Sequence, residues 1–341
     1  MTQDMQSLRP IIGCAAVLLL AAGCGASGQR PAASPAPSAA AASPPPATPA
    51  ASSSSLAPAG QVVARIRVGD YPDGITAAFG SLWTANLNSG SVSRIDPATR
   101  KVTATIAVPP GPISLLTADG AIWAADYDGT TVSRIDPARD RVTATIRVGA
   151  KPVSVLLAGG DLWVFNQGDQ TISVVDPHTA KVRRTVRLSA AAGFAASAGS
   201  LLWVPDFEGG SHDVLAVSDR TGRVTRTVHA GSQPVNVSFG AGSGWTGNGP
   251  DDTVTRFDPA TGAVQATIRT PADAGNVLAT GGAVWVTSYL GNELVKLSAG
   301  TNTVVGALGL DSEPNGIVAL DGYLWVTESG AAEVAVIRPA A

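Results

Sequence analysis

Polar side chains of the kinds that bind ligands recur at regular distances from the seven tryptophans of this 341-residue chain. One set stands three residues after each tryptophan: Asn86, Asp126, Asn166, Asp206, Asn248, Ser288 and Glu328. A second set precedes the tryptophans by nine or ten residues: Asp73, Ser114, Ser154, Asn236, Asn276 and Asn315. If the repeats form a ring, both sets surround one opening, because equivalent positions meet at the same face. The predicted ligand-binding residues are Asp73, Asn86, Asp126, Asn166, Asp206, Asn236, Asn276, Asn315 and Glu328.

Carboxylates concentrate in three repeats that would be neighbours in such a ring, at Asp73, Asp126 and Glu328. Ca²⁺ and Mg²⁺ prefer hard oxygen ligands, which several loops can supply together. The sequence therefore predicts these three residues as candidate ligands of one divalent cation, and it indicates no other cofactor. Asn, Asp and Ser also favour turns, so the alternative is that all these polar residues simply shape solvent-covered strand ends.

Three aromatic residues, Tyr127, Phe207 and Tyr289, stand one step further along these loops. Flat rings of this kind can stack on a sugar or another flat ligand. Aromatic residues at such positions also cap loops, and both roles remain open at this point.

The elements that must position these side chains follow from the tryptophan repeat. Six spacings separate the seven tryptophans, and five of them are 40 residues while one is 42; the tryptophans are Trp83, Trp123, Trp163, Trp203, Trp245, Trp285 and Trp325. Each repeat contains four phrases of strand-forming residues bounded by Gly, Pro, Asn or Asp. A period near forty with four strands is typical of propeller blades. We predict an all-β fold, a seven-bladed β-propeller with four antiparallel strands per blade and tryptophans packed between blades.

The turns of the repeat have residues that suit them. A glycine three residues before the tryptophan, such as Gly80, predicts a tight hairpin between the first and second strands. Pairs such as Asp96-Pro97 predict a turn between the third and fourth strands. The two extra residues of the fourth repeat fall within 207–213. The middle residues of the first strand carry no ionisable side chain in any repeat, so acid–base catalysis deep in the channel is not expected.

The two ends of the repeat region predict a closed ring. Residues 62–68 copy the fourth strand of the second repeat, Val142 to Val148. After Trp325 the chain has only one further strand, Val334 to Ile337. We therefore predict that strand 62–68 completes the last blade, which leaves no open sheet edge between the first and last blades.

The segment before the propeller is typical of an exported, anchored protein. Residues 1–23 contain Arg9 and the apolar run Ile11 to Ala22, and are predicted to be a lipoprotein signal peptide. Cys24 is the predicted lipidation site, residues 24–61 an Ala/Pro/Ser-rich disordered tether, and residues 62–341 the propeller. The predicted location is the outer face of the cytoplasmic membrane or the cell envelope, or outside the cell if ordinary secretory cleavage removes the signal.

Composition narrows the classes of partner. The net charge is −3, charged residues make up 14% of the chain, and no basic run is present, so nucleic acid is not an expected partner. A small molecule, a glycan or an extracellular protein is expected instead, with membrane contact only through the lipid and with the protein as a monomer. The two cysteines, Cys14 and Cys24, both precede the predicted propeller, which excludes a disulfide or a thiolate metal site within it.

The repeat resembles the YVTN-type propeller repeat and the virginiamycin B (streptogramin) lyase-like propellers over residues 62–338. The resemblance lies in Trp285-Val286-Thr287-Ser288, in the Pro-Gly phrase before the first strand, and in the Ile-Asp-Pro turn. Lyases of this kind use a histidine, a glutamate and Mg²⁺ on one face to eliminate across an ester. The resemblance makes His212 and Glu328 candidates for those catalytic roles, although they stand three blades apart and do not match the family's positions.

Two functions follow from these observations. The first is a surface-anchored, non-catalytic propeller scaffold that binds a ligand or partner at the opening of the ring. The alternative is a metal-dependent lyase or lactonase-like enzyme that uses the carboxylates near the opening with Ca²⁺ or Mg²⁺.

Overall fold

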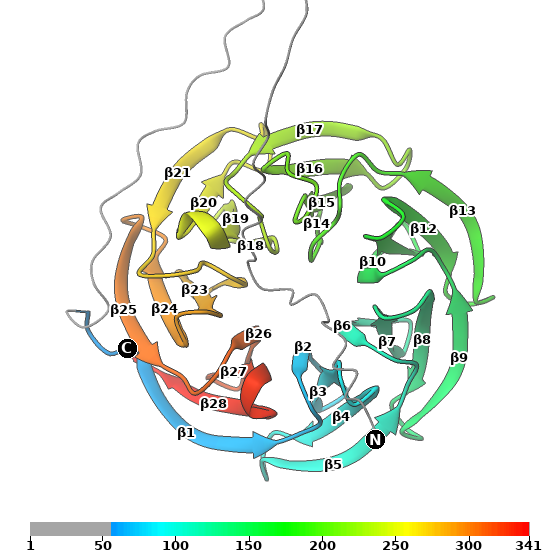
Figure 1. The fold of residues 1–341 in the computed structure, drawn as a ribbon, viewed down its shortest axis with the longest axis horizontal. Helices are drawn as coiled ribbons and strands as arrows, with labels where there is room; N and C mark the ends of the chain where they lie inside the picture. Colours follow the sequence, from blue (N-terminus) through cyan, green and yellow to red (C-terminus); the bar gives the residue numbers. More distant parts are fainter. Residues whose placement is uncertain (1–55, 341) are drawn as a thin grey trace, which may run out of the picture.

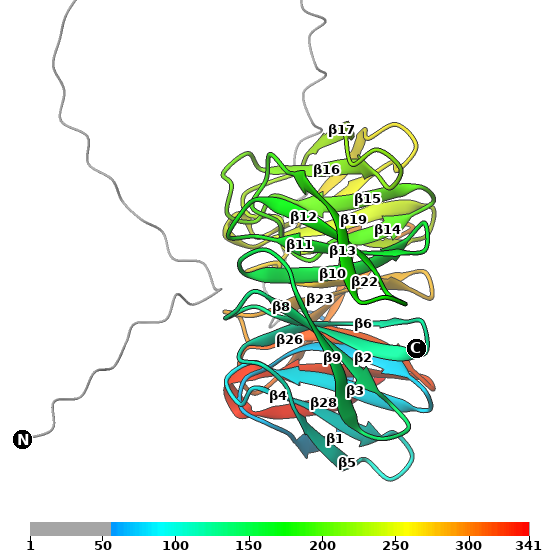
Figure 2. The same ribbon diagram turned by 90° about the vertical axis from the view of Figure 1, so that its right-hand side faces the viewer.

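The computed structural model describes residues 56–340, which form a closed ring of seven sheets around a central channel (Figure 1). Each sheet contains four antiparallel strands, named here A to D from the channel outward. Seen from the side, the ring is a disc (Figure 2). This confirms the predicted seven-bladed propeller. The predicted signal peptide, Cys24 and most of the predicted tether lie outside the described residues.

Blades 1 to 3 are the most regular, because their sequences copy one another closely. Blade 1 consists of β2 (Pro72–Ala78), β3 (Ser81–Asn86), β4 (Ser91–Asp96) and β5 (Lys101–Ala107). Blade 2 consists of β6 (Pro112–Ala118), β7 (Ala121–Asp126), β8 (Thr131–Asp136) and β9 (Arg141–Arg147). Blade 3 consists of β10 (Pro152–Ala158), β11 (Asp161–Asn166), β12 (Thr171–Asp176) and β13 (Lys181–Arg187).

Blades 4 to 6 differ from these in strand A, which is short in all three. Blade 4 consists of β14 (Ala196–Ala198), β15 (Leu201–Pro205), β16 (Asp213–Ser218) and β17 (Val224–His229). Blade 5 consists of β18 (Ser238–Gly240), β19 (Ser243–Asn248), β20 (Thr253–Phe257) and β21 (Val264–Arg269). Blade 6 consists of β22 (Val277–Thr280), β23 (Ala283–Ser288), β24 (Glu293–Ser298) and β25 (Thr303–Gly309).

Blade 7 joins the two ends of the described chain, as predicted. It consists of β26 (Pro314–Leu320), β27 (Tyr323–Glu328), β28 (Glu333–Pro339) and, as strand D, β1 (Gly60–Arg67). β1 begins two residues before the expected position, and the preceding residues also belong to the ring. Ala59 donates its backbone N–H to Ala307 O in blade 6, and Ala307 N donates to Ala57 O. The N-terminal strand therefore binds the last two blades together.

The predicted turns are present. Glycine before strand B takes a positive φ in every blade, as at Gly80 (φ 69°), and blade 4 uses Gly199 (φ 60°) instead of Ser200. Asp96 Oδ1 accepts hydrogen bonds from the backbone N–H groups of Ala98 and Thr99 between strands C and D. These two kinds of turn lie on one face of the disc. The connections from strand D to strand A and from strand B to strand C lie on the other, which we call the mouth face.

The tryptophans pack between blades, as expected. All are at most 3% exposed, and the indole N–H of Trp83 donates to Ala78 O of its own blade. Arg94 pairs with Trp83 across strands and lies over its ring, at 5.0 Å from the centroid. Its guanidinium also donates to Pro137 O of the next blade, so the tryptophan and arginine fasten neighbouring blades together. None of the helices formed by residues 56–340 has the length and apolar character needed to span a membrane.

Candidate functional site

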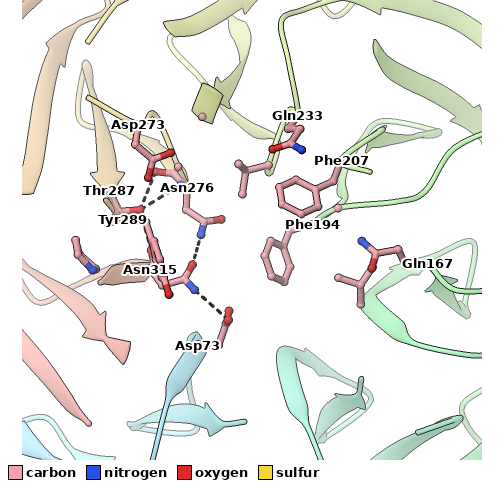
Figure 3. Close-up of a pocket in the computed structure, with 16 residues that line it drawn as sticks. Asp73, Gln167, Phe194, Phe207, Gln233, Asp273, Asn276, Thr287, Tyr289 and Asn315 are labelled. Atoms are coloured by element: carbon pink, nitrogen blue, oxygen red, sulfur yellow. Dashed lines mark hydrogen bonds between the residues drawn. The ribbon is translucent and has the colours of Figure 1, made fainter. Parts of the chain in front are cut away.

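A pocket of about 640 Å³, open solvent included, lies at the mouth of the channel. Its lining residues come from the connections between strands D and A of blades 4 to 6, from the start of strand A in other blades, and from connections between strands B and C. A second, deeper space occupies the channel directly below it and shares Asp73, Phe194 and Asn276 with the mouth. Figure 3 shows two opposed walls: Phe194 and Phe207 lie on one side, with Gln167 and Gln233 beside them, and the mainly polar side chains lie on the other.

The short strands A of blades 4 to 6 make room for this pocket. In blades 1 to 3 strand A runs from a proline at the mouth face down to the hairpin, as in β2. In blades 4 to 6 the corresponding residues form loops, and regular pairing begins later, at Ala196, Ser238 and Val277. Residues of those loops line the mouth instead of continuing the sheet.

The aromatic wall consists of Phe194 and Phe207, which face the pocket from blade 4 (Figure 3). Phe194 is held between blades, because its backbone N–H donates to Val235 O and its carbonyl accepts from Val237 N. Phe207 N donates to Ala191 O, which ties the enlarged connection between strands B and C to the connection before strand A. Both rings therefore stand on backbone fixed by hydrogen bonds.

The polar wall is a chain of side-chain hydrogen bonds across three blades. Asn276 Nδ2 donates to Asn315 Oδ1 at 2.6 Å, and Asn315 Nδ2 donates to Asp73 Oδ2 at 3.0 Å (Figure 3). Asp73 is 4% exposed. Burial raises the pKa of its carboxyl to about 7, and the hydrogen bond from Asn315 only partly offsets this rise.

Asp273 and Tyr289 extend the polar wall from blade 6. Asp273 Oδ2 accepts a hydrogen bond from the backbone N–H of Leu290 at 2.8 Å. The Tyr289 hydroxyl meets the Tyr71 hydroxyl of blade 1 at 2.5 Å. This wall thus connects blade 6 to blade 1 past blade 7.

The second predicted set of polar residues lies where the sequence placed it. Asp73, Asn276 and Asn315 line the mouth, while Ser114, Ser154 and Asn236 line the channel below. Asn236 is committed to the scaffold, since its amide accepts from Val277 N and donates to Val277 O of blade 6. Asp73, Asn276 and Asn315 are therefore the predicted residues that the structure brings together at one accessible wall.

The first predicted set lies inside the blades and not around the opening. Asn86 is fully buried, and its Nδ2 donates to the hydroxyls of Ser91 and Ser93 on strand C. Asn166 and Asn248 make the same pair of bonds in blades 3 and 5. The reason is the twist of the blade, which turns the last side chain of strand B toward strand C. These amides close the corner between strands B and C.

The remaining members of that set also serve their own loops. Asp206 accepts from Ala191 N and from the backbone and hydroxyl of Ser211, and so holds the enlarged blade 4 connection. Ser288 donates to Ala272 O. Glu328 is fully buried in blade 7, where Oε1 accepts from Asp311 N and Oε2 accepts from Arg65 Nε.

The three carboxylates predicted as metal ligands are not brought together. Among residues 56–340, the acidic side chains that converge are Asp311, Glu328 and Glu333, with oxygens within 4.8 Å of one another. Arg65 lies among them, 2.8 Å from Asp311 and 3.0 Å from Glu328. Its guanidinium pairs with two of these carboxylates, and Asp73 and Asp126 belong to other blades.

His212 and Glu328 do not form a pair either. His212 is exposed in the blade 4 connection, where Nδ1 lies 3.1 Å from Ser232 Oγ. Glu328 is occupied by Arg65 and the backbone of Asp311 on the far side of the ring. His178 contacts Asp119 on the opposite face, and His229 contacts Asp213 on the outer edge.

Asp126 ends strand B of blade 2, at the position where blades 1, 3 and 5 have asparagine, and this difference predicts a stability effect. Thr131 and Ser133 donate to Asp126 Oδ2, so the hydroxyls point the opposite way from those around Asn86. Burial raises the pKa of Asp126 from 3.8 to about 7, and the two hydroxyls lower it only in part. The folded state therefore binds more protons than the unfolded state between these values, and stability falls as pH rises through that window.

Asp126→Asn should remove this loss, because Asn86, Asn166 and Asn248 show that an amide fits the same corner. At pH 8 we expect the free energy of unfolding to rise by about 1–3 kcal/mol, whereas near pH 4 the variant and the wild type should differ little. Urea unfolding at the two pH values measures this. Asp136→Asn, in a turn where a hydrogen bond from Arg139 lowers the pKa, is the contrasting control. Equal effects of Asp126→Asn at both pH values would contradict the assignment.

Comparison with known proteins bears on the fold. No protein-family model matches the chain, and a search of curated proteins gives no match. Virginiamycin B lyase from Staphylococcus aureus is similar in structure, with a TM-score of 0.69, 15% sequence identity, and coverage of 81% of this chain and 99% of the lyase. Hydrazine synthase from Kuenenia stuttgartiensis matches with a TM-score of 0.67 and 16% identity over 79% of this chain and 96% of that one. The computationally designed protein Ika8 matches with a TM-score of 0.63 and 12% identity over 82% of this chain and 100% of its own.

These neighbours include natural proteins and a designed one, and at such low identity they establish the seven-bladed propeller fold alone. The fold is similar to that of virginiamycin B lyase.

Some residues of the site had no place in the sequence prediction. Phe194, Gln233 and Asp273 line the mouth, although they stand outside both regular sets. Blades 4 and 6 have Ala192 and Ala274 at the position where the other five blades have a proline. That departure is the signal in the sequence that accompanies the irregular start of strand A in these two blades.

Proposed function

We propose that this protein is a recognition propeller that binds a small ligand or the exposed group of a partner at its mouth, without catalysis. The single observation that carries the proposal is the pair of opposed walls, Phe194 and Phe207 facing Asp73, Asn276 and Asn315 (Figure 3). Pockets with an apolar face and a few fixed polar groups are the usual form of small-molecule sites.

The contacts of Glu328 and His212 favour recognition over the lyase alternative. A lyase of the resembling kind needs a histidine and a glutamate near one metal ion, whereas Glu328 is held by Arg65 and His212 lies beside Ser232. The mouth also has its polar groups tied to one another, which suits binding with little rearrangement.

The proposal includes the predicted anchoring through Cys24, with the mouth presented outside the cytoplasmic membrane or within the cell envelope. Mass measurement of the N-terminal peptide, with or without acyl chains, decides between lipidation and simple secretion. The expected ligand is a small molecule, a glycan or an exposed group of an extracellular protein, and the expected oligomeric state is a monomer.

Loss of one ring of the aromatic wall should weaken binding. For compounds that bind the full chain in a ligand-observed NMR screen, Phe207→Ala should weaken binding about tenfold, because it removes one of the two aromatic faces against which the ligand packs. Phe79→Ala is the matched control, since Phe79 is 45% exposed on the opposite face. Compounds whose binding survives both Phe207→Ala and Asn315→Ala would show that the mouth is not the site.

A further inference from the structure

The charges of the protein are sorted between the mouth face and the outer edge. The connections from strand D to A and from strand B to C contain a single lysine, Lys151, no arginine, and His212 as their histidine. Half of these connections contain acids, which are Asp70, Asp128, Asp169, Asp206, Glu208, Asp251, Asp252, Asp273, Asp311 and Glu313. Arginines stand at the mouth-face ends of several outermost strands, at the rim of the disc and away from the channel, as at Arg147, Arg187 and Arg269. A concave opening surrounded by one sign of charge focuses the field on the ligand that enters it.

The residues that line the mouth are likewise acidic and lack basic side chains. Within residues 56–340, no lysine, arginine or histidine lines either the mouth pocket or the channel below it, whereas Asp73 and Asp273 do. Asp73 is buried and receives one hydrogen bond from a neutral amide. A buried carboxyl normally has a cationic partner, and the described part of the chain supplies none to Asp73.

Two hydrogen-bond acceptors of the pocket are left without a donor among residues 56–340. Gln233 Oε1 is buried in the mouth lining with no hydrogen-bond partner. Asp73 Oδ1 accepts no hydrogen bond from the described part of the chain, since the bond from Asn315 goes to Oδ2. An ammonium group is a pure donor with three N–H bonds, and it therefore suits a pocket with this imbalance.

The opposite wall suits the rest of such a ligand. Phe194 and Phe207 are partly exposed toward the pocket, and Tyr289 adds a third ring on the polar side (Figure 3). Aromatic faces attract cations and also cover apolar surface. Elsewhere on this face an ammonium already lies over a ring, with Lys151 Nζ at 5.4 Å from the centroid of Tyr127.

We infer that the mouth binds a small organic ammonium ion, with the charged nitrogen at Asp73 and the apolar body against Phe194 and Phe207. This inference rests on the proposed function and specifies its ligand class. It distinguishes a cationic ligand from the neutral or anionic molecules that a mouth with opposed walls would otherwise admit.

Three isosteric probes test the charge directly: phenethylamine, phenethyl alcohol and phenylacetate. Ligand-observed NMR titration of the full chain at pH 8 should show the amine binding about tenfold or more tightly than either of the others. Asp73→Asn should reduce affinity for the amine about fivefold or more while leaving the alcohol nearly unchanged, because the amide can still accept the bond from Asn315. Asp169→Asn is the control and should leave the affinities for the amine and the alcohol unchanged. Asp169 lies on the same face but outside the mouth, where its carboxylate accepts a hydrogen bond from Ala150 N.

Equal or tighter binding of the alcohol or the acid would overturn the ammonium assignment, as would amine binding that Asp73→Asn leaves intact. Failure of all three probes to bind would overturn it too. A different result would contradict the proposed function: no compound, whatever its charge, would show binding that Phe207→Ala weakens. Melting curves of each variant confirm that the fold is kept.

Discussion

Deletion of residues 60–69 from the full chain should lower the melting temperature by more than about 10 °C. These residues form β1, which pairs with β28 along its whole length, from Gly60 with Pro339 to Arg67 with Glu333. Without β1, blade 7 has no strand D, and the polar edge of β28 is left unpaired. The deletion also removes Ile66 from the cluster that contains Leu82 and Trp325 at the junction of blades 7 and 1.

Deletion of residues 30–39, an equal length from the Ala/Pro/Ser-rich segment, is the control and should leave the melting temperature unchanged. Differential scanning calorimetry of both variants gives the comparison. Equal effects of the two deletions would show that β1 contributes nothing to closure of the ring. That result would contradict the pairing of β1 with blade 7 and the hydrogen bond from Ala59 to blade 6.

Arg65→Met should cost about 2–4 kcal/mol, because it leaves the fully buried Glu328 without its cation. The Arg65 side chain is 31% exposed, which reduces the expected loss below that of a completely buried pair. Arg65 also pairs with Asp311, so three charges on three different segments meet where the ring closes. Chemical denaturation at pH 7 measures the loss.

The partner variant separates charge from packing. Glu328→Gln in the Arg65→Met background should recover most of the lost free energy, since it removes the unpaired carboxylate and keeps the shape. Arg67→Met is the control, since Arg67 is exposed at the end of β1, two residues after Arg65. This change should alter the free energy of unfolding by less than about 0.5 kcal/mol. A loss for Arg65→Met that Glu328→Gln does not relieve would show that the arginine acts through its aliphatic part.

The fold was predictable because the tryptophan and the glycine hairpin recur in all seven repeats and the Asp-Pro turn in four, and each of them specifies local structure. Closure was predictable because the spare strand at one end copies a strand missing at the other. The first residues of the ring were not predictable, because Ala57 and Ala59 join it through backbone hydrogen bonds with Ala307, and such bonds do not depend on side-chain type.

The site was predictable in part, and the division has a physical cause. The period of the repeat gives the height of a residue along its strand, and Asp73, Asn276 and Asn315 were placed at the mouth on that basis. It does not give the direction of a side chain after the blade has twisted. Asn86 and its equivalents therefore turned out to be buried beside strand C and not at the opening.

The aromatic wall and the size of the pocket depend on irregularity, which a repeat pattern does not describe. Gly193 and Phe194 precede a strand A of only three residues, and the space that opens there follows from how blades 4 and 5 pair through Phe194 and Asn236. That contact joins residues from two blades, and neither sequence predicts it alone.

The pairing of β1 with β28 also has a consequence in time. The first strand of the ring finds its partner only after the last strand has been synthesised, because nearly the whole propeller separates Gly60 from Pro339. Contacts this distant in sequence form late and slowly. A nascent chain can complete blades 1 to 6 as it emerges, but blade 7 stays open until residue 339 has arrived. A chain that ends before β28 therefore keeps β1 unpaired at its N-terminal end, where the strand is exposed to aggregation and proteolysis.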